Sequence, residues 1–440
     1  MTLALRTNGL TVRILGALGL LEIVGGALLL AGGAASAPSQ YVPARVGGFP
    51  DWLAGPLRWL DLGIDQDRFQ VLVIAMAIGY EAVLLSVRAL PAWSVYAAVL
   101  TAHAILLAGP VLLSQDLFGY LSFARLGALH GLDPYTNAAA AAPLDAVYPF
   151  TGWHDVHSPY GPLFTLLSYA LVPLGVAGGV WALKTLAVSA SLGAVALVAQ
   201  AAERTGRSPA AAAAFVGLNP VLLISAVGGF HNDMLLVLAF GAALALSAGA
   251  HPRLRAAVAA LVAGVGVKLS AGLVLPFVLL APRTWRARTW LAADAAAGLV
   301  LLAFIGVLGF GTHALGFVGA VREQQQLVAV HSVPAELARL VGLSGVPDWW
   351  RHLFALAFAL VLAFALWRTA RGADWRVAAG FSTLALLVST AWLLPWYAIW
   401  ALPLAAVSSN RRLRAATLAF CVYALLIRLP LADPWLTPGQ

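Results

Sequence analysis

Charged side chains are scarce in this sequence. Only 10% of its 440 residues are Asp, Glu, Lys or Arg, whereas 61% are hydrophobic and the mean hydropathy is +0.88. Soluble globular domains carry about 25% charged residues, so this composition excludes an ordinary soluble protein. The sequence instead predicts an all-α integral-membrane protein, a polytopic bundle of transmembrane helices.

Cysteine and lysine are nearly absent. Cys421 is the only cysteine and lies inside an apolar run, which excludes an intramolecular disulfide and a cysteine metal site. Lys184 and Lys268 are the only lysines, so the formal net charge of +8 comes from arginine. Because the arginines lie in short loops between apolar runs, the positive-inside rule accounts for them. We therefore expect membrane lipids around the chain and no nucleic-acid partner.

Long apolar runs predict the membrane spans. Runs of roughly twenty residues are long enough to cross a bilayer, and we count about thirteen of them in a single integral-membrane domain over residues 1–440. Arg6 and Arg13 precede a first apolar run that is too long for a signal-peptide core, which predicts a retained helix and a cytoplasmic N-terminus. The predicted spans are 12–33, 69–87, 93–113, 180–202, 210–228, 234–248, two short helices between 256 and 281, 289–310, 352–367, 377–393, 397–407 and 415–429.

Two outer loops, 114–162 and 311–350, separate the spans, and the first gathers polar groups at unusual density. It holds four aspartates, three histidines and four tyrosines directly after a span, including Asp116, Asp133, His157 and Tyr160. Residues 116–130 have a helical apolar stripe, which predicts a helix lying along the membrane surface. The run 163–173 is too short to span.

Asp116 is the leading candidate for a functional carboxylate. Asp116 and Tyr120 are four residues apart and therefore share one helix face, with Arg125 further along the same helix. A carboxylate at a cavity mouth can take a proton from an attacking hydroxyl, and we expect partial burial to raise its pKa. The alternative is that Asp116 only caps the following helix, and spacing alone favours the cap.

Histidines supply weaker signals. His154 and His157 have the spacing of a metal pair, but the sequence places no third ligand, so we expect no divalent metal and no cofactor. His231, Asn232 and Asp233 form either a helix-capping turn or a polar cluster at the end of a span. That span is interrupted at Asn219-Pro220, and a broken span is tolerated only against protein or water.

Lysine and arginine supply candidates for binding a phosphate. Lys268 lies where the two short helices meet, and a lysine at such depth indicates a function. Arg322, Arg339 and Arg428 are further candidates, with solvated loop charge as the alternative for the first two. Trp396 and Tyr397 fit membrane-interface anchors, with sugar stacking as the minor alternative.

These motifs together resemble the GT-C class of integral-membrane glycosyltransferases, and within it the bacterial polyprenol-phosphate-mannose-dependent alpha-mannosyltransferases. The resemblance covers about the first two-thirds of the chain. It rests on Asp116-xxx-Tyr120, Gly131-Leu132-Asp133-Pro134-Tyr135, Tyr160-Gly161-Pro162-Leu163, Asn219-Pro220 followed by His231-Asn232-Asp233, and Gly266-Val267-Lys268.

The resemblance implies mannose transfer at the outer face of a bacterial plasma membrane. It implies a polyprenyl-phosphate sugar donor, no nucleotide sugar, a glycolipid or polysaccharide acceptor, inversion at the anomeric carbon and Asp116 as general base. The expected substrate-binding residues, which combine these motifs with outer-loop cations, are Tyr120, Arg125, Asp133, Tyr135, His157, Tyr160, His231, Asn232, Asp233, Lys268, Arg322 and His331.

Two other functions stay open at the level of sequence. The same type of donor could carry arabinose or another pentose. A secondary transporter or lipid flippase could use the broken helices around Lys268 as its binding site, but such a protein should show an internal repeat, and we find no matching halves.

Overall fold

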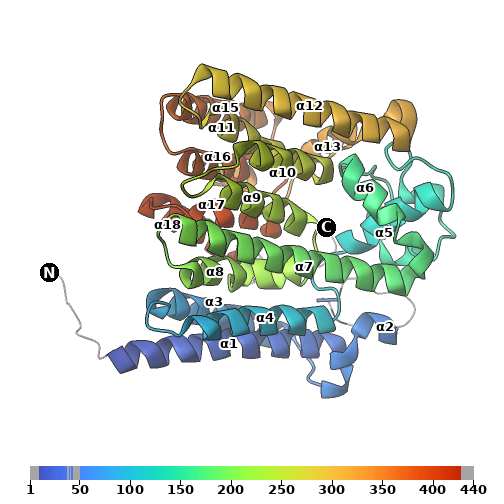
Figure 1. Cartoon of the computed structure of the whole chain (residues 1–440). Helices are drawn as coiled ribbons and strands as arrows, with labels where there is room; N and C mark the ends of the chain where they lie inside the picture. Colours follow the sequence, from blue (N-terminus) through green and yellow to red (C-terminus); the bar gives the residue numbers. More distant parts are fainter. Residues whose placement is uncertain (1–8, 37–38, 40, 43–49, 428–440) are drawn as a thin grey trace.

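Helices form every regular element of the described structure. The computed structural model describes residues 9–36, 39, 41–42 and 50–427, and within them no strand occurs. The long helices run side by side along a common direction (Figure 1). The all-α membrane-bundle class predicted from composition is therefore confirmed.

One layer of the bundle comes from the N-terminal part of the chain. Helices α1, α3 and α4 pack together there, and Figure 1 shows them along one side of the molecule. Glycines permit the close approach of α1 to α3: a Cβ on Gly19 would overlap the backbone of Gly79. Close packing of small residues is the usual basis of helix association in lipid. The elements are α1 Gly9–Ser36, α2 Asp51–Ala54, η1 Pro56–Leu60, α3 Gln66–Ser86 and α4 Ala92–Ala108.

The middle of the bundle contains the predicted break at Asn219-Pro220. Helix α8 ends before it, the π-helical turn η5 follows, and the two axes differ by 51°. Proline lacks a backbone N–H, so the helix cannot continue through it with regular hydrogen bonds. This region comprises α7 Gly175–Arg204, α8 Pro209–Gly217, η5 Val221–Val227 and α9 Asp233–Ser247.

A second break lies at Lys268, as the sequence predicts. Helix α10 ends at Val267, Lys268 itself is extended, and the 3-10 turn η6 follows. This part comprises α10 Leu254–Val267, η6 Leu269–Leu273, α11 Leu275–Leu280 and α12 Trp285–Phe310. The C-terminal part comprises α15 Asp348–Ala370, α16 Trp375–Ser389, η8 Pro395–Ala401, α17 Leu402–Ala406 and α18 Arg411–Leu426.

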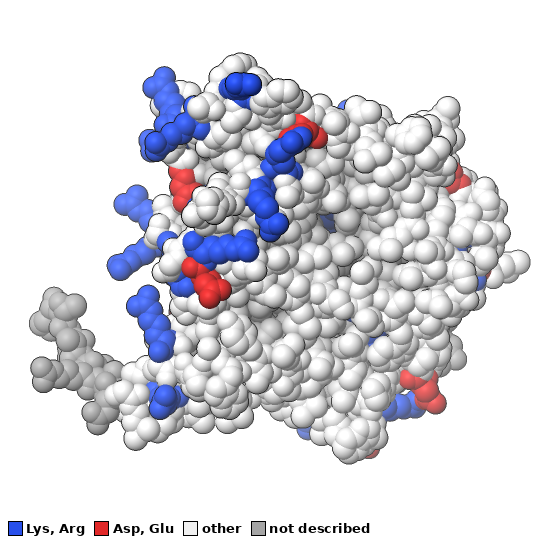
Figure 2. All heavy atoms as spheres, in the orientation of Figure 1, with Lys and Arg blue, Asp and Glu red and all other residues white. Residues whose placement is uncertain are grey.

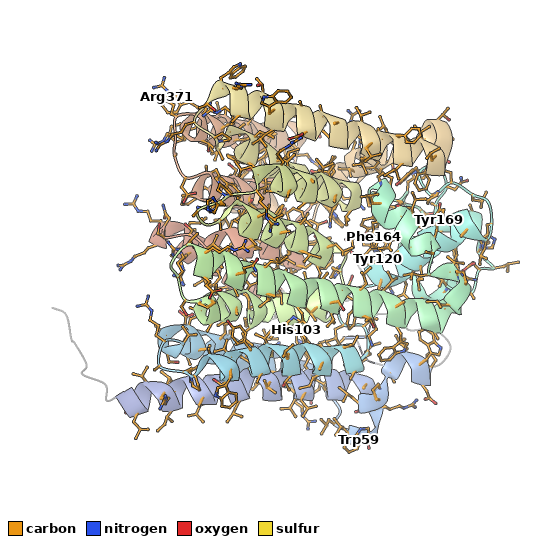
Figure 3. The ribbon with its side chains drawn as sticks, viewed as in Figure 1. Trp59, His103, Tyr120, Phe164, Tyr169 and Arg371 are labelled. Atoms are coloured by element: carbon orange, nitrogen blue, oxygen red, sulfur yellow. The ribbon has the colours of Figure 1, made fainter. Side chains whose placement is uncertain are left out.

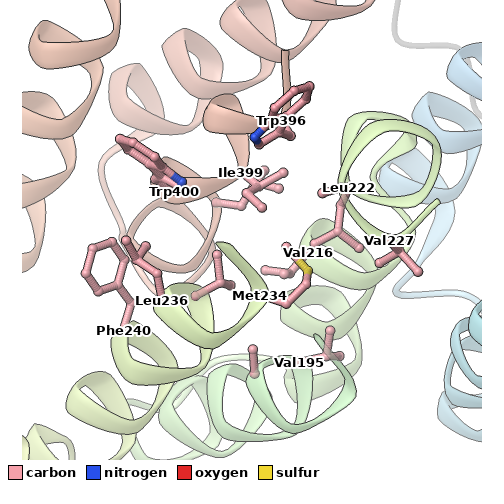
Figure 4. Packing of buried hydrophobic residues seen from close by; sticks show 14 of the residues in the cluster. Val195, Val216, Leu222, Val227, Met234, Leu236, Phe240, Trp396, Ile399 and Trp400 are labelled. Atoms are coloured by element: carbon pink, nitrogen blue, oxygen red, sulfur yellow. The ribbon is translucent and has the colours of Figure 1, made fainter. Parts of the chain in front are cut away.

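Aromatic side chains of η8 enter the apolar core. Figure 4 shows Trp396, Ile399 and Trp400 of η8 in one apolar cluster with residues of η5 and α9, among them Leu222 and Met234. Trp396 and Trp400 are buried, so the prediction that Trp396 anchors the membrane interface is wrong. These large aromatic rings bury much apolar surface and so join the C-terminal part of the chain to the apolar core.

The two segments predicted as outer loops, 114–162 and 311–350, fold into short helices at one end of the bundle. The first contains α5 Asp116–Ala128, η2 Ala139–Ala141, η3 Tyr148–Phe150 and α6 Pro162–Tyr169, with η4 Val172–Leu174 after it; the second contains η7 Gly311–His313, α13 Gly316–Gln326 and α14 Val333–Leu340. Helix α5 forms as predicted, but nearly all of its residues are buried, so it does not lie on the surface. The apolar stripe could not reveal this, because α6 and α7 cover it from other parts of the chain.

Charge divides the two ends of the bundle. Arginines gather at the end opposite α5 and α6, on the left in Figure 2, and Arg371 is labelled at that end in Figure 3. Tyr120, Phe164 and Tyr169 are labelled at the other end in Figure 3. Within the part of the chain that the structure describes, five helices are long and apolar enough to cross a membrane, or six if the bent α8–η5 pair is one span. The count of about thirteen spans stays a prediction.

Candidate active site

A cavity opens among the loop helices and the broken helices. It contains about 980 Å³ of empty space, counting the part open to solvent. Asp116 and Tyr160 line it from the first outer loop and Lys268 from the break after α10. Trp400 lines it from η8 and Gln324 from α13. Segments far apart in the sequence therefore share one cavity.

Asp116 is held by two ring systems. Its Oδ1 accepts a hydrogen bond of 2.9 Å from Nε1 of Trp153, and its Oδ2 lies 3.2 Å from Nδ1 of His231. The His231 ring stacks on Trp396 with 3.7 Å between ring centroids. The carboxylate is fixed in orientation, and its remaining lone pairs can still accept a hydrogen.

The pKa of Asp116 lies below the ordinary value for aspartate. Burial alone would raise this pKa, but the interactions with His231, the charge of Lys268 and the N–H of Trp153 stabilise the carboxylate and outweigh burial. The expectation that burial raises this pKa is therefore wrong, because the sequence did not place the three partners. Asp116 is ionised at neutral pH, which is the form that a general base needs.

Asp233 and Lys268 form a buried ion pair at the inner part of the cavity. Nζ of Lys268 lies 2.9 Å from both carboxylate oxygens of Asp233, and Nε1 of Trp400 donates to Oδ1 at 2.7 Å. The side chain of Asp233 is 1% exposed and that of Lys268 is 17% exposed, so the ammonium faces the cavity while the carboxylate does not. The rings of Tyr397 and Trp400 lie 4.7 and 5.4 Å from Nζ, within cation–π range.

Tyrosines connect the first outer loop to the His231 turn. The hydroxyl of Tyr120 accepts from the backbone N–H of Asn232 at 3.2 Å and lies 3.4 Å from Oδ1 of that residue. Tyr120 meets Tyr160 and Phe164 edge to face, with centroids 4.9 and 5.1 Å apart. Burial, with the nearby charge of Asp116, raises the pKa of Tyr120 and of Tyr160 well above the ordinary value, so both hydroxyls stay neutral.

Strained backbone precedes both halves of the site. Leu113 has φ of 60° and Phe230 has φ of 51°, values that residues with a side chain adopt rarely. A hydrogen bond from Leu112 N–H to the carbonyl of Gly228, 2.8 Å long, joins the two segments. Strain of this kind persists only where surrounding structure imposes it, and it clusters at functional sites.

Lys184 supports the same two segments from α7. Its Nζ donates to the carbonyl of Gly109 at 2.6 Å and lies 3.6 Å from the ring of Trp181 and 5.0 Å from that of Phe230. The side chain is buried. Sequence reasoning did not single out this lysine, although its position inside a predicted span was the available signal.

Several predicted residues lie away from the cavity and have structural partners. Arg125 pairs with Asp145 at 2.8 Å, and His130 contacts the same carboxylate. Arg125, with His130, holds the pKa of Asp145 below its usual range despite burial. Asp133 pairs with His313 at 3.0 Å and accepts from the backbone N–H of Tyr135. These contacts stabilise the loop fold and do not reach the cavity.

Three other predicted residues also lie outside the cavity lining. Tyr135 packs against Phe310 and donates to the carbonyl of Tyr160 at 3.0 Å. His157 contacts Glu323 at 3.0 Å. His331 contacts Glu336 at 2.8 Å. None of these three lines the cavity.

The remaining cation candidates are also outside the cavity lining. Arg322 is exposed, and Arg339 pairs with Glu336. Arg428 lies outside the described residues. Among the residues that the structure describes, His, Cys, Asp and Glu form no cluster that could hold a metal ion.

Tryptophans are the main site residues that sequence reasoning missed. Trp153 donates a hydrogen bond to Asp116, Trp400 donates one to Asp233, and Trp392 lines the cavity. The density of tryptophan near loop ends was the only signal, and it is typical of any membrane protein.

Comparison with known proteins identifies the family. The sequence profile described as "Alpha-(1->6)-mannopyranosyltransferase, N-terminal domain" matches residues 13–284, more than half of the chain. The profile described as "MptB C-terminal domain" matches residues 326–435. The chain belongs to this mannosyltransferase family. The resemblance predicted from motifs is thereby confirmed, and the cavity combines residues from both matched parts.

Two relatives of the same family show the extent of the similarity. An alpha-(1->6)-mannopyranosyltransferase A of Mycobacterium tuberculosis is 30% identical over 363 residues, covering 74% of this chain and 67% of the relative. The protein of the same name from Corynebacterium glutamicum is 32% identical over 183 residues, covering 40% of this chain and 36% of the relative. The matches thus span about two thirds and about one third of the relatives' own lengths. No solved structure matches the chain significantly.

Proposed function

We propose that the protein transfers mannose from a polyprenyl-phosphate donor to a glycan acceptor, with Asp116 as general base. The observation that carries this proposal is the cavity in which an ionised carboxylate, Asp116, and an ammonium, Lys268, both face the same space. Mannose as the sugar follows from the family, whose relatives are named alpha-(1->6)-mannopyranosyltransferases.

The reaction needs only one base. The acceptor oxygen forms a bond to the anomeric carbon while the bond from that carbon to the phosphate oxygen breaks, and the electrons of that bond leave with polyprenyl phosphate. Asp116 takes the hydroxyl proton. Attack opposite the leaving phosphate inverts the anomeric centre, whereas a retaining reaction usually uses a second carboxylate about 5 Å away as nucleophile. Asp233 is not suited to that role, because Lys268 and Trp400 occupy its oxygens.

Lys268 supplies the positive charge for the departing phosphate. It lines the cavity, and among the described lining residues it is the only cation. A phosphate is a good leaving group, so stabilisation of its developing charge can replace a general acid. The pairing with Asp233 holds the ammonium in place before the donor binds, which is the preorganisation that electrostatic catalysis requires.

The donor and stereochemistry can be tested with purified protein. Radiolabelled mannosyl polyprenyl phosphate and GDP-mannose are each supplied with octyl α-mannoside, and the product anomer is determined by NMR. We expect transfer only from the lipid donor, with the product anomer opposite to that of the donor. Transfer from GDP-mannose, or retention of configuration, would contradict the proposal. A lipid donor that carries arabinose tests the pentose alternative, and we expect it to be the poorer substrate.

A further inference from the structure

Two tryptophans and two glutamines line the cavity with side chains that are half-buried or exposed, and we refer to this part of the lining as the mouth. Trp153 comes from the first outer loop, Trp392 from the connection after α16, and Gln324 and Gln325 from α13. The indole rings meet edge to face, with centroids 6.1 Å apart and planes at 80°. Both rings are half-buried, so each presents part of its surface to the cavity.

We infer that this mouth is the binding site for the terminal hexose of the acceptor glycan. The inference rests on the proposed function and adds the site of the second substrate. In an inverting displacement the attacking hydroxyl and the leaving phosphate lie on opposite sides of the anomeric carbon. Lys268 marks the phosphate side, so the acceptor must reach Asp116 from another side. Trp153 contacts Asp116 directly, which makes the mouth the adjoining approach.

The chemistry of the mouth suits a neutral sugar. Indole rings offer broad apolar surfaces with a polar edge, and carboxamide groups both donate and accept hydrogen bonds, as hydroxyl groups require. The charged residues that precede Gln324 on α13, Arg322 and Glu323, do not line the cavity. Arg322 is exposed, and Glu323 contacts His157. An anionic acceptor would find no cation here among the described lining residues except Lys268, which the donor phosphate uses.

Trp392 is the better residue for a test, because Trp153 also orients the base. Replacement of Trp153 would disturb Asp116 and acceptor binding together. Trp153 and His231, and not Trp392, contact the carboxylate of Asp116 within the described structure, and the Trp392 ring contacts Trp153 at the mouth. Gln324 provides a second test on another segment, with Gln326 of the same helix as its matched control, since Gln326 is exposed and does not line the cavity.

The experiment measures KM separately for the two substrates, with octyl α-mannoside as acceptor and mannosyl polyprenyl phosphate as donor. For Trp392→Ala we expect the acceptor KM to rise roughly ten-fold, as the loss of one aromatic contact implies, with the donor KM unchanged. Trp392→Phe should recover part of the acceptor affinity. Gln324→Ala should raise the acceptor KM, and Gln326→Ala should leave both constants unchanged.

Each outcome separates this inference from the proposed function. An unchanged acceptor KM in both Trp392→Ala and Gln324→Ala, or a donor KM that rises in proportion, would overturn the acceptor site and leave mannose transfer intact. Failure of the wild-type protein to use the lipid donor would overturn the proposed function itself. If Trp392→Ala does not fold, Trp392→Phe and Gln324→Ala decide the question.

Discussion

At the scale of single residues, the site depends on how His231 tunes Asp116. The interaction with His231 is the largest of the effects that lower the pKa of Asp116 against the opposing effect of burial. A base with a lowered pKa stays deprotonated, and active, to lower pH. Activity is lost as the pH falls through that pKa.

Replacement of His231 should therefore change the pH dependence of transfer. In His231→Gln the pKa of Asp116 should rise, because burial raises this pKa and the interaction with His231 that lowers it is lost. The acidic limb of the profile of kcat/KM should therefore move to higher pH. The profile is measured from about pH 4 to about pH 8. His130→Gln is the control, since His130 contacts Asp145 away from the cavity. An acidic limb that stays in place in His231→Gln, or moves equally in the control, would contradict the assignment.

Local sequence identified the ionisable residues of the site but not their partners. Asp116, Asp233 and Lys268 could be identified as candidates because a charged group beside a long apolar run is energetically costly and usually functional. Trp153, Trp392 and Trp400 did not, because their contacts join segments far apart in the sequence. Arg125 was misplaced for the same reason: its partner Asp145 lies in the loop, and spacing along one helix could not reveal it.

At the scale of elements, the breaks in the helices were predictable and their surroundings were not. Two features of the sequence predicted where the chain leaves regular helix: Pro220, and the short interval between the two basic loops that flank Lys268. Helix α5 was placed correctly along the chain but assigned to the wrong environment. In a chain apolar on nearly every face, periodicity does not distinguish a surface that meets lipid from one that meets protein.

One close approach joins the two motifs that frame the cavity. The N–H of Gly161 donates to the carbonyl of Val267 at 2.9 Å, and a Cβ at Gly161 would overlap the backbone of Gly266. The Tyr160-Gly161-Pro162 and Gly266-Val267-Lys268 motifs are therefore in contact. Glycine at position 161 lets the two backbones meet, which places Tyr160 and Lys268 in the same cavity.

At the scale of the whole molecule, the separation of charge favours one orientation in the membrane. We propose that the arginine-rich end faces the cytoplasm and that the cavity end faces outward. Under this orientation a lipid donor reaches the cavity from the outer leaflet. Nucleotide sugars, which are soluble in the cytoplasm, would not reach it.

Cysteine labelling tests this orientation. Cys421 is the only cysteine and is buried, so the wild-type protein provides an unlabelled background. Leu144 in the first outer loop is 98% exposed, and Ser409 is exposed between α17 and α18. We expect an impermeant maleimide to label Leu144→Cys in intact cells and Ser409→Cys only after permeabilisation. The reverse pattern would place the cavity on the cytoplasmic side and exclude the proposed orientation.

The most direct test of the account is the turnover of Asp116→Asn with the lipid donor. The variant keeps the shape of the side chain but cannot take the hydroxyl proton, so we expect transfer to slow by roughly 10²–10⁴-fold while the donor Kd stays unchanged. Asp67→Asn, a change at an exposed carboxylate in the first turn of α3, should behave as wild type. Full turnover by Asp116→Asn, or loss of donor binding together with turnover, would contradict the role of Asp116 as the base.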